Sequence, residues 1–246
     1  LYHHTASLTN GAGDNSYRYA GASESVNNYV CFGNTTTPCP ADNLYRIIGV
    51  FDNKVGENQT EQRVKLIKSD YATSTLLGGE GDYSKMYTAN GYDNSGYKGN
   101  NLANVAGYNW NKSNKNTWSL SNLNKTNLNQ NFITNIRAEW AKKIAETTWK
   151  VGGNTYANIY SQPAKTAYQN EIVNPSTNAT FSAKIGLMYA SDYGFAASPS
   201  AWTTNLVSYK GEAIKNVNWM YMGLSEWTIS RAADNGYGVF GVFSTG

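Results

Sequence analysis

Two strand-forming runs, separated by one polar loop, constrain the fold of this chain most strongly. Residues 44–51 are rich in β-branched and aromatic side chains, and residues 63–68 alternate apolar and charged ones. Such alternation is typical of a strand that buries one face and exposes the other to water. Because only the loop 52–61 joins the two runs, the sequence predicts a β-hairpin.

Two helices are predicted in the middle of the chain. The first covers 132–144, where apolar residues recur at helical spacing and charged residues occupy the opposite face. Its apolar positions are Phe132, Ile133, Ile136, Trp140 and Ile144. Asn127 or Asn131 is the candidate cap at its start. The second helix covers 162–172, with Ser161 as the candidate N-cap.

Further strands are expected on both sides of the second helix. The runs that predict them are 149–151, 183–189, 219–222, 226–231 and 239–243. A hairpin followed by helices and then by strands indicates an α+β domain with antiparallel sheet, not alternating βαβ units. We expect residues 1–246 to form one domain with long irregular loops, notably 78–118. About residues 1–43 form an N-terminal extension of coil and short strands, free to pack on it.

The two cysteines predict a disulfide. Cys31 and Cys39 flank a short loop rich in Gly, Asn, Thr and Pro, which can bring their sulfur atoms together. An isolated pair of this kind in an exported protein is usually bonded. A metal site would require two further ligands at a recognisable spacing, which the sequence lacks. We therefore expect neither a metal nor a cofactor.

The composition points to a protein that faces outward. Only 15% of the residues are charged, while Tyr (19) and Gly (23) are frequent and Asn is abundant. Tyr, Ser, Gly and Asn are adaptable contact residues, as in antibody loops. With a net charge of +3 and no basic run, the chain is not expected to bind nucleic acid. It has no membrane-spanning run, so we expect any membrane anchor to lie outside it.

Candidate catalytic residues are few. His3 and His4 lie at the start of the chain, where we expect a frayed segment. The carboxylates considered for a hydrolase pair are Glu171, Asp192 and Glu226. Glu226 is the best catalytic candidate of the three, but a Glu beside Trp is more often a buried, hydrogen-bonded structural acid. The residues 234–236 predict a turn, because the further carboxylates of a calcium loop are missing. No catalytic residue is assigned.

The C-terminal run carries a resemblance to a known fold. Residues 219–231, WMYMGLSEWTISR, followed after a short polar stretch by VFGV at 239–242, resemble the E-W-T-x-S-R pattern of C-type-lectin-like proteins. The similar branch contains formylglycine-generating enzymes and the variable proteins of diversity-generating retroelements. Nearly the whole chain, including NLYRIIGVF and KIGLMYASDYGFAASPSAWTT, resembles Gram-positive surface or pilin-like proteins of gut bacteria.

The resemblance implies a C-type-lectin-like fold with a twisted antiparallel sheet and two main helices. It also implies export to the bacterial cell surface, with a pilin-type or membrane segment removed from the N-terminus. Formylglycine-generating enzymes use catalytic cysteines, and the matching C-terminal half of this chain has none. Calcium-dependent lectins carry a Glu-Pro-Asn or Gln-Pro-Asp motif, whereas the nearest string here, at 162–164, lacks the acid. Neither activity is therefore transferred.

In the diversified relatives, displayed residues alternate with fixed apolar ones, and the same logic holds for any strand. Val239, Phe240 and Val242 correspond to the fixed set. The displayed candidates are Ala232, Ala233, Asp234, Gly236, Tyr237, Gly238, Gly241 and Phe243. Because Val239 breaks the alternation, a bulge or bend is expected near Gly238. Phe243 is either an exposed binding anchor or packs under a further strand.

Three classes of function follow from these observations. The first is a surface-displayed, adhesin-like binding domain whose partner is an unknown protein or glycan. The second is a structural subunit of a pilus or surface layer, and the third is a glycan-active hydrolase. Variation among sibling sequences concentrated at 232–243 would favour the first class.

Overall fold

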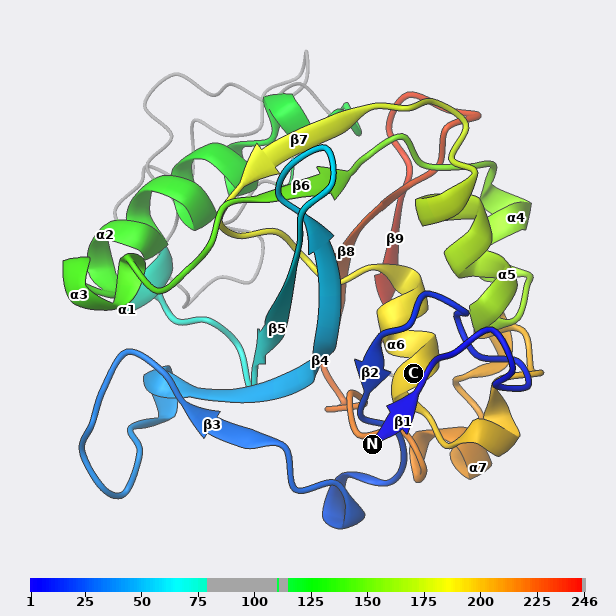
Figure 1. The fold of residues 1–246 in the computed structure, drawn as a ribbon, viewed down its shortest axis with the longest axis horizontal. Helices are drawn as coiled ribbons and strands as arrows, with labels where there is room; N and C mark the ends of the chain where they lie inside the picture. Colours follow the sequence, from blue (N-terminus) through cyan, green and yellow to red (C-terminus); the bar gives the residue numbers. More distant parts are fainter. Residues whose placement is uncertain (79–109, 111–114, 245–246) are drawn as a thin grey trace.

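The computed structural model describes residues 1–78, 110 and 115–244 (Figure 1). Most of the long irregular segment predicted at 78–118 lies outside the described residues. Within them, helices are interspersed among antiparallel strands, which confirms the predicted α+β class.

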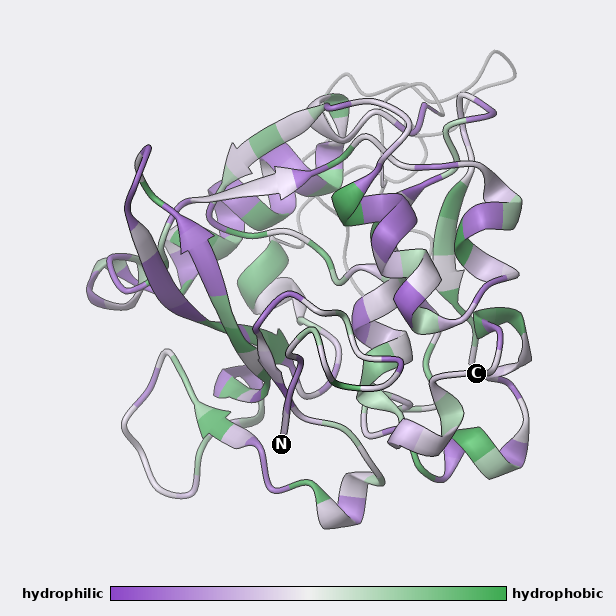
Figure 2. Ribbon diagram, turned by 45° about the vertical axis from the view of Figure 1, so that its right-hand side comes forward, coloured by the Kyte–Doolittle hydropathy of each residue, from purple (hydrophilic) through white to green (hydrophobic). Residues whose placement is uncertain are grey.

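The predicted hairpin forms the centre of the largest sheet. β4 (Leu44–Lys54) pairs with β5 (Thr60–Lys68) in antiparallel register, from Tyr45 opposite Lys68 to Lys54 opposite Thr60. Both strands run further into the predicted loop than expected. Their outer ends are hydrophilic and their inner ends hydrophobic (Figure 2), because only the inner ends face the core.

The first 43 residues are joined to this sheet. β3 (Tyr29–Cys31) and β2 (Tyr17–Arg18) pair with the β4 edge opposite β5, and β1 (Tyr2–His3) pairs with β2. Gly49 of β4 permits the approach of β2, since a Cβ atom there would lie 2.1 Å from the Tyr17 carbonyl oxygen. The N-terminal extension is thus part of the main sheet.

The expectation of a frayed start is wrong. The His4 side chain is fully buried, and its Nδ1 accepts the N–H of Ala12 at 3.0 Å. Burial lowers the pKa of His4 to about 4, because the protonated ring would lose its hydration. His3 stacks on Tyr17 at a centroid distance of 4.1 Å. Aromatic packing therefore orders the first residues of the chain, which were predicted to be frayed because of their terminal position.

Cys31 and Cys39 form the predicted disulfide, with their Cα atoms 5.7 Å apart. The bond lies at the end of β3 and closes the loop that leads into β4. Arg46 of β4 holds the segment 26–28 in place, because its guanidinium donates hydrogen bonds to the Asn28 side chain and the Val26 carbonyl oxygen.

The helix predicted at 132–144 begins earlier and is interrupted. A π-helical segment, Leu123–Phe132, leads into α2 (Ile133–Asn135). Arg137 then adopts a φ of +73°, which no α-helical residue has, and α3 (Ala138–Ala141) starts afresh after it.

The predicted caps of this helix are also wrong, because both asparagines lie inside the helical segment. The side chains of Asn127 and Asn131 donate to the carbonyl oxygen of Leu77, at 2.8 and 2.9 Å. Leu77 ends the short helix α1 (Ser74–Leu77), whose terminal carbonyl groups need such donors. Trp140, expected inside the core, is half-buried at its margin.

The second predicted helix is confirmed with a different start. α5 (Ala164–Tyr168) continues as the π-helical segment Gln169–Val173. Its N-cap is Pro163, so the cap predicted at Ser161 is wrong. A helix that was not predicted, α4 (Tyr156–Tyr160), precedes it.

Two of the later strand predictions need correction. β6 (Thr147–Lys150) pairs with β7 (Thr180–Ala183). Because β7 ends at Ala183, the strand predicted at 183–189 does not form. The apolar run instead leads into α6 (Ala190–Ala196), every residue of which is buried. Residues 219–222 form turns rather than a strand, and they follow the short helix α7 (Glu212–Lys215).

Helix α6 connects the main sheet to the C-terminal strands. It packs against α5 and β8 (Glu226–Arg231) and lies near the centre of the view in Figure 1. Tyr193 and Ala196 of α6 share a buried cluster with Ile48 of β4 and with Val242 near the C-terminus. The C-terminal strands therefore rest on a rigid interior.

Candidate functional site

The C-terminal strands form an antiparallel ladder. β8 pairs with β9 (Val239–Val242), with Glu226 opposite Val242 and Trp227 opposite Gly241 (Figure 1). Both strands agree with the sequence prediction. Among the described residues, these two strands alone form the sheet.

This outer face carries exposed aromatic side chains. Trp227 is 43% exposed and Phe243, directly after β9, is 71% exposed. Phe243 and Gly241 share one face of the strand because they are two residues apart, and Trp227 lies opposite Gly241. The glycine is required, since a Cβ atom there would lie 2.9 Å from the Glu226 carbonyl oxygen. The two exposed aromatic residues therefore lie on the same face of the ladder, on either side of one glycine.

The inner face of the ladder is packed. Phe240 and Val242 are buried and Val239 is half-buried, which agrees with their expected inward orientation. The Thr228 hydroxyl donates to the Phe240 carbonyl oxygen at 2.7 Å and fixes the two strands together.

The irregularity expected near Gly238 lies elsewhere. The register shifts on β8, where residues 228–230 stand opposite Phe240 alone. Two contacts draw this part of β8 toward the interior: Ile229 donates its N–H to the Met188 carbonyl oxygen, and the Ser230 hydroxyl donates to Glu171. The bulge therefore serves the attachment of β8 to the core.

Residues 232–238, here called the display loop, connect β8 to β9. Asp234, Gly236 and Tyr237 are exposed, Tyr237 by 66%, while Ala233 and Gly238 are half-buried. Of the displayed candidates, the structure thus exposes these three together with Gly241 and Phe243.

Ala232 does not belong to the displayed set. It is only 1% exposed and lies in a buried cluster with Ile159, Ala190 and Phe240. It also forms a parallel bridge with Asn154, which lies two positions before the start of α4. The alternation of strand faces fails here because β8 ends at Arg231.

Tyr156, which the sequence did not single out, borders the display loop. Its backbone N–H lies 3.3 Å from both carboxylate oxygens of Asp234. Its ring stacks on Phe240 at a centroid distance of 5.4 Å and contacts Tyr160 at 3.9 Å. About half of the Tyr156 side chain is exposed, at the side of the hairpin where Phe240 packs. The four-residue spacing of the two tyrosines was the available signal.

The display loop is held from beneath by Asn116. This side chain is 1% exposed, and its Nδ2 lies within hydrogen-bonding distance of the carbonyl oxygens of Ala232 (2.8 Å), Asn235 (3.1 Å) and Gly238 (2.7 Å). Its backbone N–H donates to the Gly236 carbonyl oxygen at 2.8 Å. The local sequence around residue 116 does not predict this contact.

Glu226 is the one candidate acid that lies on the hairpin. Its Oε2 is buried and has no hydrogen-bond partner among the described residues. Burial raises the pKa of Glu226 to about 7, because no nearby donor compensates the carboxylate for lost hydration. The expectation of a buried acid is confirmed, but the expected hydrogen bonding of the side chain is not complete.

The other two candidate acids are buried in structural networks. Asp192 accepts hydrogen bonds from Lys65 and from the N–H of Tyr189, and it lies 3.5 Å from Arg18. Glu171 accepts the N–H of Ser191 at 2.8 Å and the Ser230 hydroxyl, and desolvation raises its pKa. The geometry brings neither to the hairpin surface.

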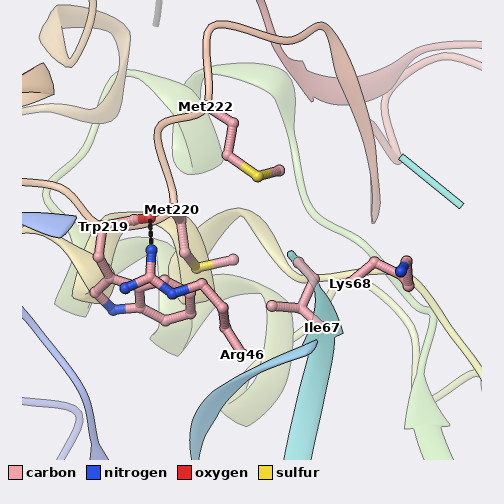
Figure 3. A pocket seen from close by; sticks show the side chains of 6 residues that line it. All are labelled: Arg46, Ile67, Lys68, Trp219, Met220 and Met222. Carbon is pink, nitrogen blue, oxygen red and sulfur yellow. Dashed lines mark hydrogen bonds between the residues drawn. The ribbon is translucent and has the colours of Figure 1, made fainter. Parts of the chain in front are cut away.

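A small hollow opens beside the main sheet (Figure 3). It is lined by Arg46, Ile67, Lys68, Trp219, Met220 and Met222. The Arg46 guanidinium donates to the Trp219 carbonyl oxygen at 3.0 Å, and Lys68 donates to the carbonyl oxygens of Ala41 and Leu44. Both cations are thus engaged with the backbone, and the hollow offers apolar side chains rather than reactive groups.

Within the ranges that the structure describes, no group of three or more His, Cys, Asp or Glu side chains could hold a metal ion. In the same residues, no helix has the length and apolar character needed to cross a bilayer. Comparison of the chain with protein-family models, with curated proteins and with solved structures finds no match. The site is therefore interpreted from its own geometry.

Proposed function

We propose that this chain is a surface-displayed, adhesin-like domain that binds its ligand through the β8–β9 hairpin and the display loop. The observation that carries the proposal is the exposure of three large aromatic side chains, Trp227, Tyr237 and Phe243, on one short hairpin. Exposed aromatic groups gathered on a rigid base are typical of binding surfaces, where they supply most of the affinity.

The proposal extends to the fold family and the location of the protein. The E-W-T-x-S-R run forms β8 and the VFGV run forms β9, which supports a C-type-lectin-like fold. The Cys31–Cys39 disulfide supports an oxidising, extracellular setting at the bacterial cell surface.

The chemistry of the surface favours a neutral or basic protein or glycan as partner. Residues 232–243 contain one carboxylate, Asp234, and no Lys or Arg. An acidic partner would meet this carboxylate without a compensating cation from the segment. Aromatic rings beside a carboxylate suit both sugar rings with their hydroxyl groups and basic side chains, which contact rings through cation–π interactions.

The test is a screen of the purified domain against immobilised glycans and extracellular host proteins. A ligand that supports the proposal binds the unaltered domain and is lost by Trp227→Ala and Phe243→Ala. Tyr71→Ala is the matched control, because Tyr71 is a similarly exposed aromatic residue outside the hairpin. Equal loss with Tyr71→Ala, or binding that survives both hairpin variants, would contradict the proposal.

A structural subunit of a pilus or surface layer is the second candidate. The favouring observation is β9 itself, whose VFGVF run carries none of the charged residues or prolines that usually prevent strands from pairing with other chains. Concentration-dependent assembly in sedimentation experiments, abolished by Phe243→Lys but not by Tyr71→Lys, would favour this candidate over ligand binding.

A further inference from the structure

We propose that Asn116 is the positioning residue of the display loop: its buried side chain sets the loop backbone from outside, so that Asp234 and Tyr237 are presented in one preformed arrangement. The inference rests on the proposed function only in treating the loop as a binding surface. The conformational claim concerns the free protein and is tested without a ligand.

The contacts of Asn116 all fall on the loop backbone. A side-chain amide has two N–H groups, and the Nδ2 of Asn116 faces three carbonyl oxygens, from Ala232, Asn235 and Gly238. These oxygens come from both ends and the middle of the loop, so one side chain closes the loop upon itself. The backbone N–H of Asn116 adds a bond to Gly236.

The other supports come from within the loop as well as from outside it, and the Ala232 N–H donates to the Gly238 carbonyl oxygen at 2.9 Å to join the two loop ends. Ala233 donates its N–H to the Asn154 carbonyl oxygen at 2.8 Å, and Asp234 receives the N–H of Tyr156. Within the loop, Asn235 Oδ1 accepts the N–H groups of Tyr237 and Gly238. Among the described residues, the Tyr237 side chain forms no hydrogen bond or ring contact that would define the loop conformation.

This arrangement separates the residues that shape the loop from those that it presents. Fixing a flexible residue costs backbone entropy, which a ligand would otherwise have to offset on binding. A loop already ordered by Asn116 avoids that cost, the usual advantage of preorganised binding surfaces. Tyr237 can also be substituted without loss of the loop conformation, because its exposed side chain is not one of the supports.

The test uses a nitroxide spin label at Tyr237→Cys. Both native cysteines are in the disulfide, so the introduced thiol is labelled selectively in protein kept oxidised. In the parent the label reports a restricted backbone. With Asn116→Asp, which keeps the shape but removes the two donors, or with Asn116→Ala, we expect at least a two-fold shorter rotational correlation time.

Asn218→Asp is the matched control, since Asn218 is also buried and donates to a carbonyl oxygen, that of Tyr193, away from the loop. A second label at Val207→Cys, exposed elsewhere, reports any general loosening. The proposal requires mobility to rise at 237 with the Asn116 variants and to stay unchanged at 207 and in Asn218→Asp. Equal label mobility at 237 in the Asn116 and Asn218 variants would overturn it.

Amide hydrogen exchange of the unaltered protein provides a measurement that does not depend on folding of the variants. We expect the N–H groups of Ala233 and Gly238 to exchange at least ten-fold more slowly than those of the exposed turn 55–59. Exchange as fast as in that turn would overturn the inference. An ordered loop that binds nothing would count against the proposed function alone.

Discussion

Glu226 stands opposite Val242 across the β8–β9 ladder, so an ionisable side chain enters the apolar inner face of the hairpin whose outer face exposes Trp227. Tyr193 of α6 is a titratable group close to Glu226, and it also lies close to Tyr221. No described cation pairs with the Glu226 carboxylate, which leaves its charged form unfavourable in the folded state.

The first prediction is that Glu226 makes the protein less stable as the pH rises. The folded pKa of about 7 exceeds the ordinary value of 4.5, so the folded state binds more protons between these values. The contribution is fully present below pH 4.5 and is lost as the pH rises to 7. Glu226→Gln, which stays neutral, should exceed the parent by about 1–3 kcal/mol at pH 8 and match it at pH 4.

Urea unfolding at both pH values measures this difference. Glu212→Gln is the control, because Glu212 is exposed and paired with Lys215 at the surface. A Glu226→Gln variant with the same advantage at pH 4 and pH 8 would show that ionisation is not the cause.

The second prediction concerns His4 and has the opposite sign. Burial lowers its folded pKa from 6.5 to about 4, so the unfolded state binds more protons between these values. Stability should therefore fall as the pH drops from 6.5 toward 4. In His4→Gln this decrease at acid pH should disappear. At pH 7 the free energy of unfolding of the variant should be about 1–3 kcal/mol lower than that of the parent, because Gln packs less well. Thermal unfolding from pH 4 to pH 7 measures both effects, and an unchanged acid slope in His4→Gln would refute the assignment.

The third prediction is that Asp192 is essential for folding rather than for binding. It bonds Lys65 and the N–H of Tyr189 from a buried position on α6. Asp192→Asn leaves the partly buried ammonium group of Lys65 without its anion and should cost about 3–5 kcal/mol. The exposed pair of Arg63 and Glu61 provides the control, where Glu61→Gln should cost less than about 1 kcal/mol. Similar losses at both sites in denaturant unfolding would contradict this view.

The sequence predicted those elements whose pattern reflects one buried face. The β4 run is predicted by its β-branched and aromatic residues, and the β5 run by its alternation of apolar and charged residues. α6 was missed because all its residues are buried, which removes the helical period and makes the run 183–189 look like the start of a central strand. The break at Arg137 has no local signal, since that residue type rarely adopts a positive φ.

The candidate site was predictable to a similar extent. The exposed Phe243 and the buried Phe240 follow from strand alternation, whereas Ala232 lies beyond the end of β8 and is placed by its packing against Ile159. The support of the display loop could not be predicted, because Asn116 meets it across more than a hundred residues of chain. Hydrogen bonds between residues so distant in sequence depend on the tertiary structure, and the local sequence does not predict them.

The last prediction separates the displayed aromatic residues from the packed one. Tyr237 and Phe243 are exposed, so Tyr237→Ala with Phe243→Ala should lower stability by less than about 1 kcal/mol while abolishing ligand binding. Phe240 stacks on Tyr156 inside a buried cluster, and Phe240→Ala should cost about 3–5 kcal/mol. Denaturant unfolding measures both values, and ligand titration of the folded double variant measures binding. A double variant that unfolds would identify these aromatics as core residues and would favour the structural-subunit function, because a face that the fold itself requires is not free to bind a ligand.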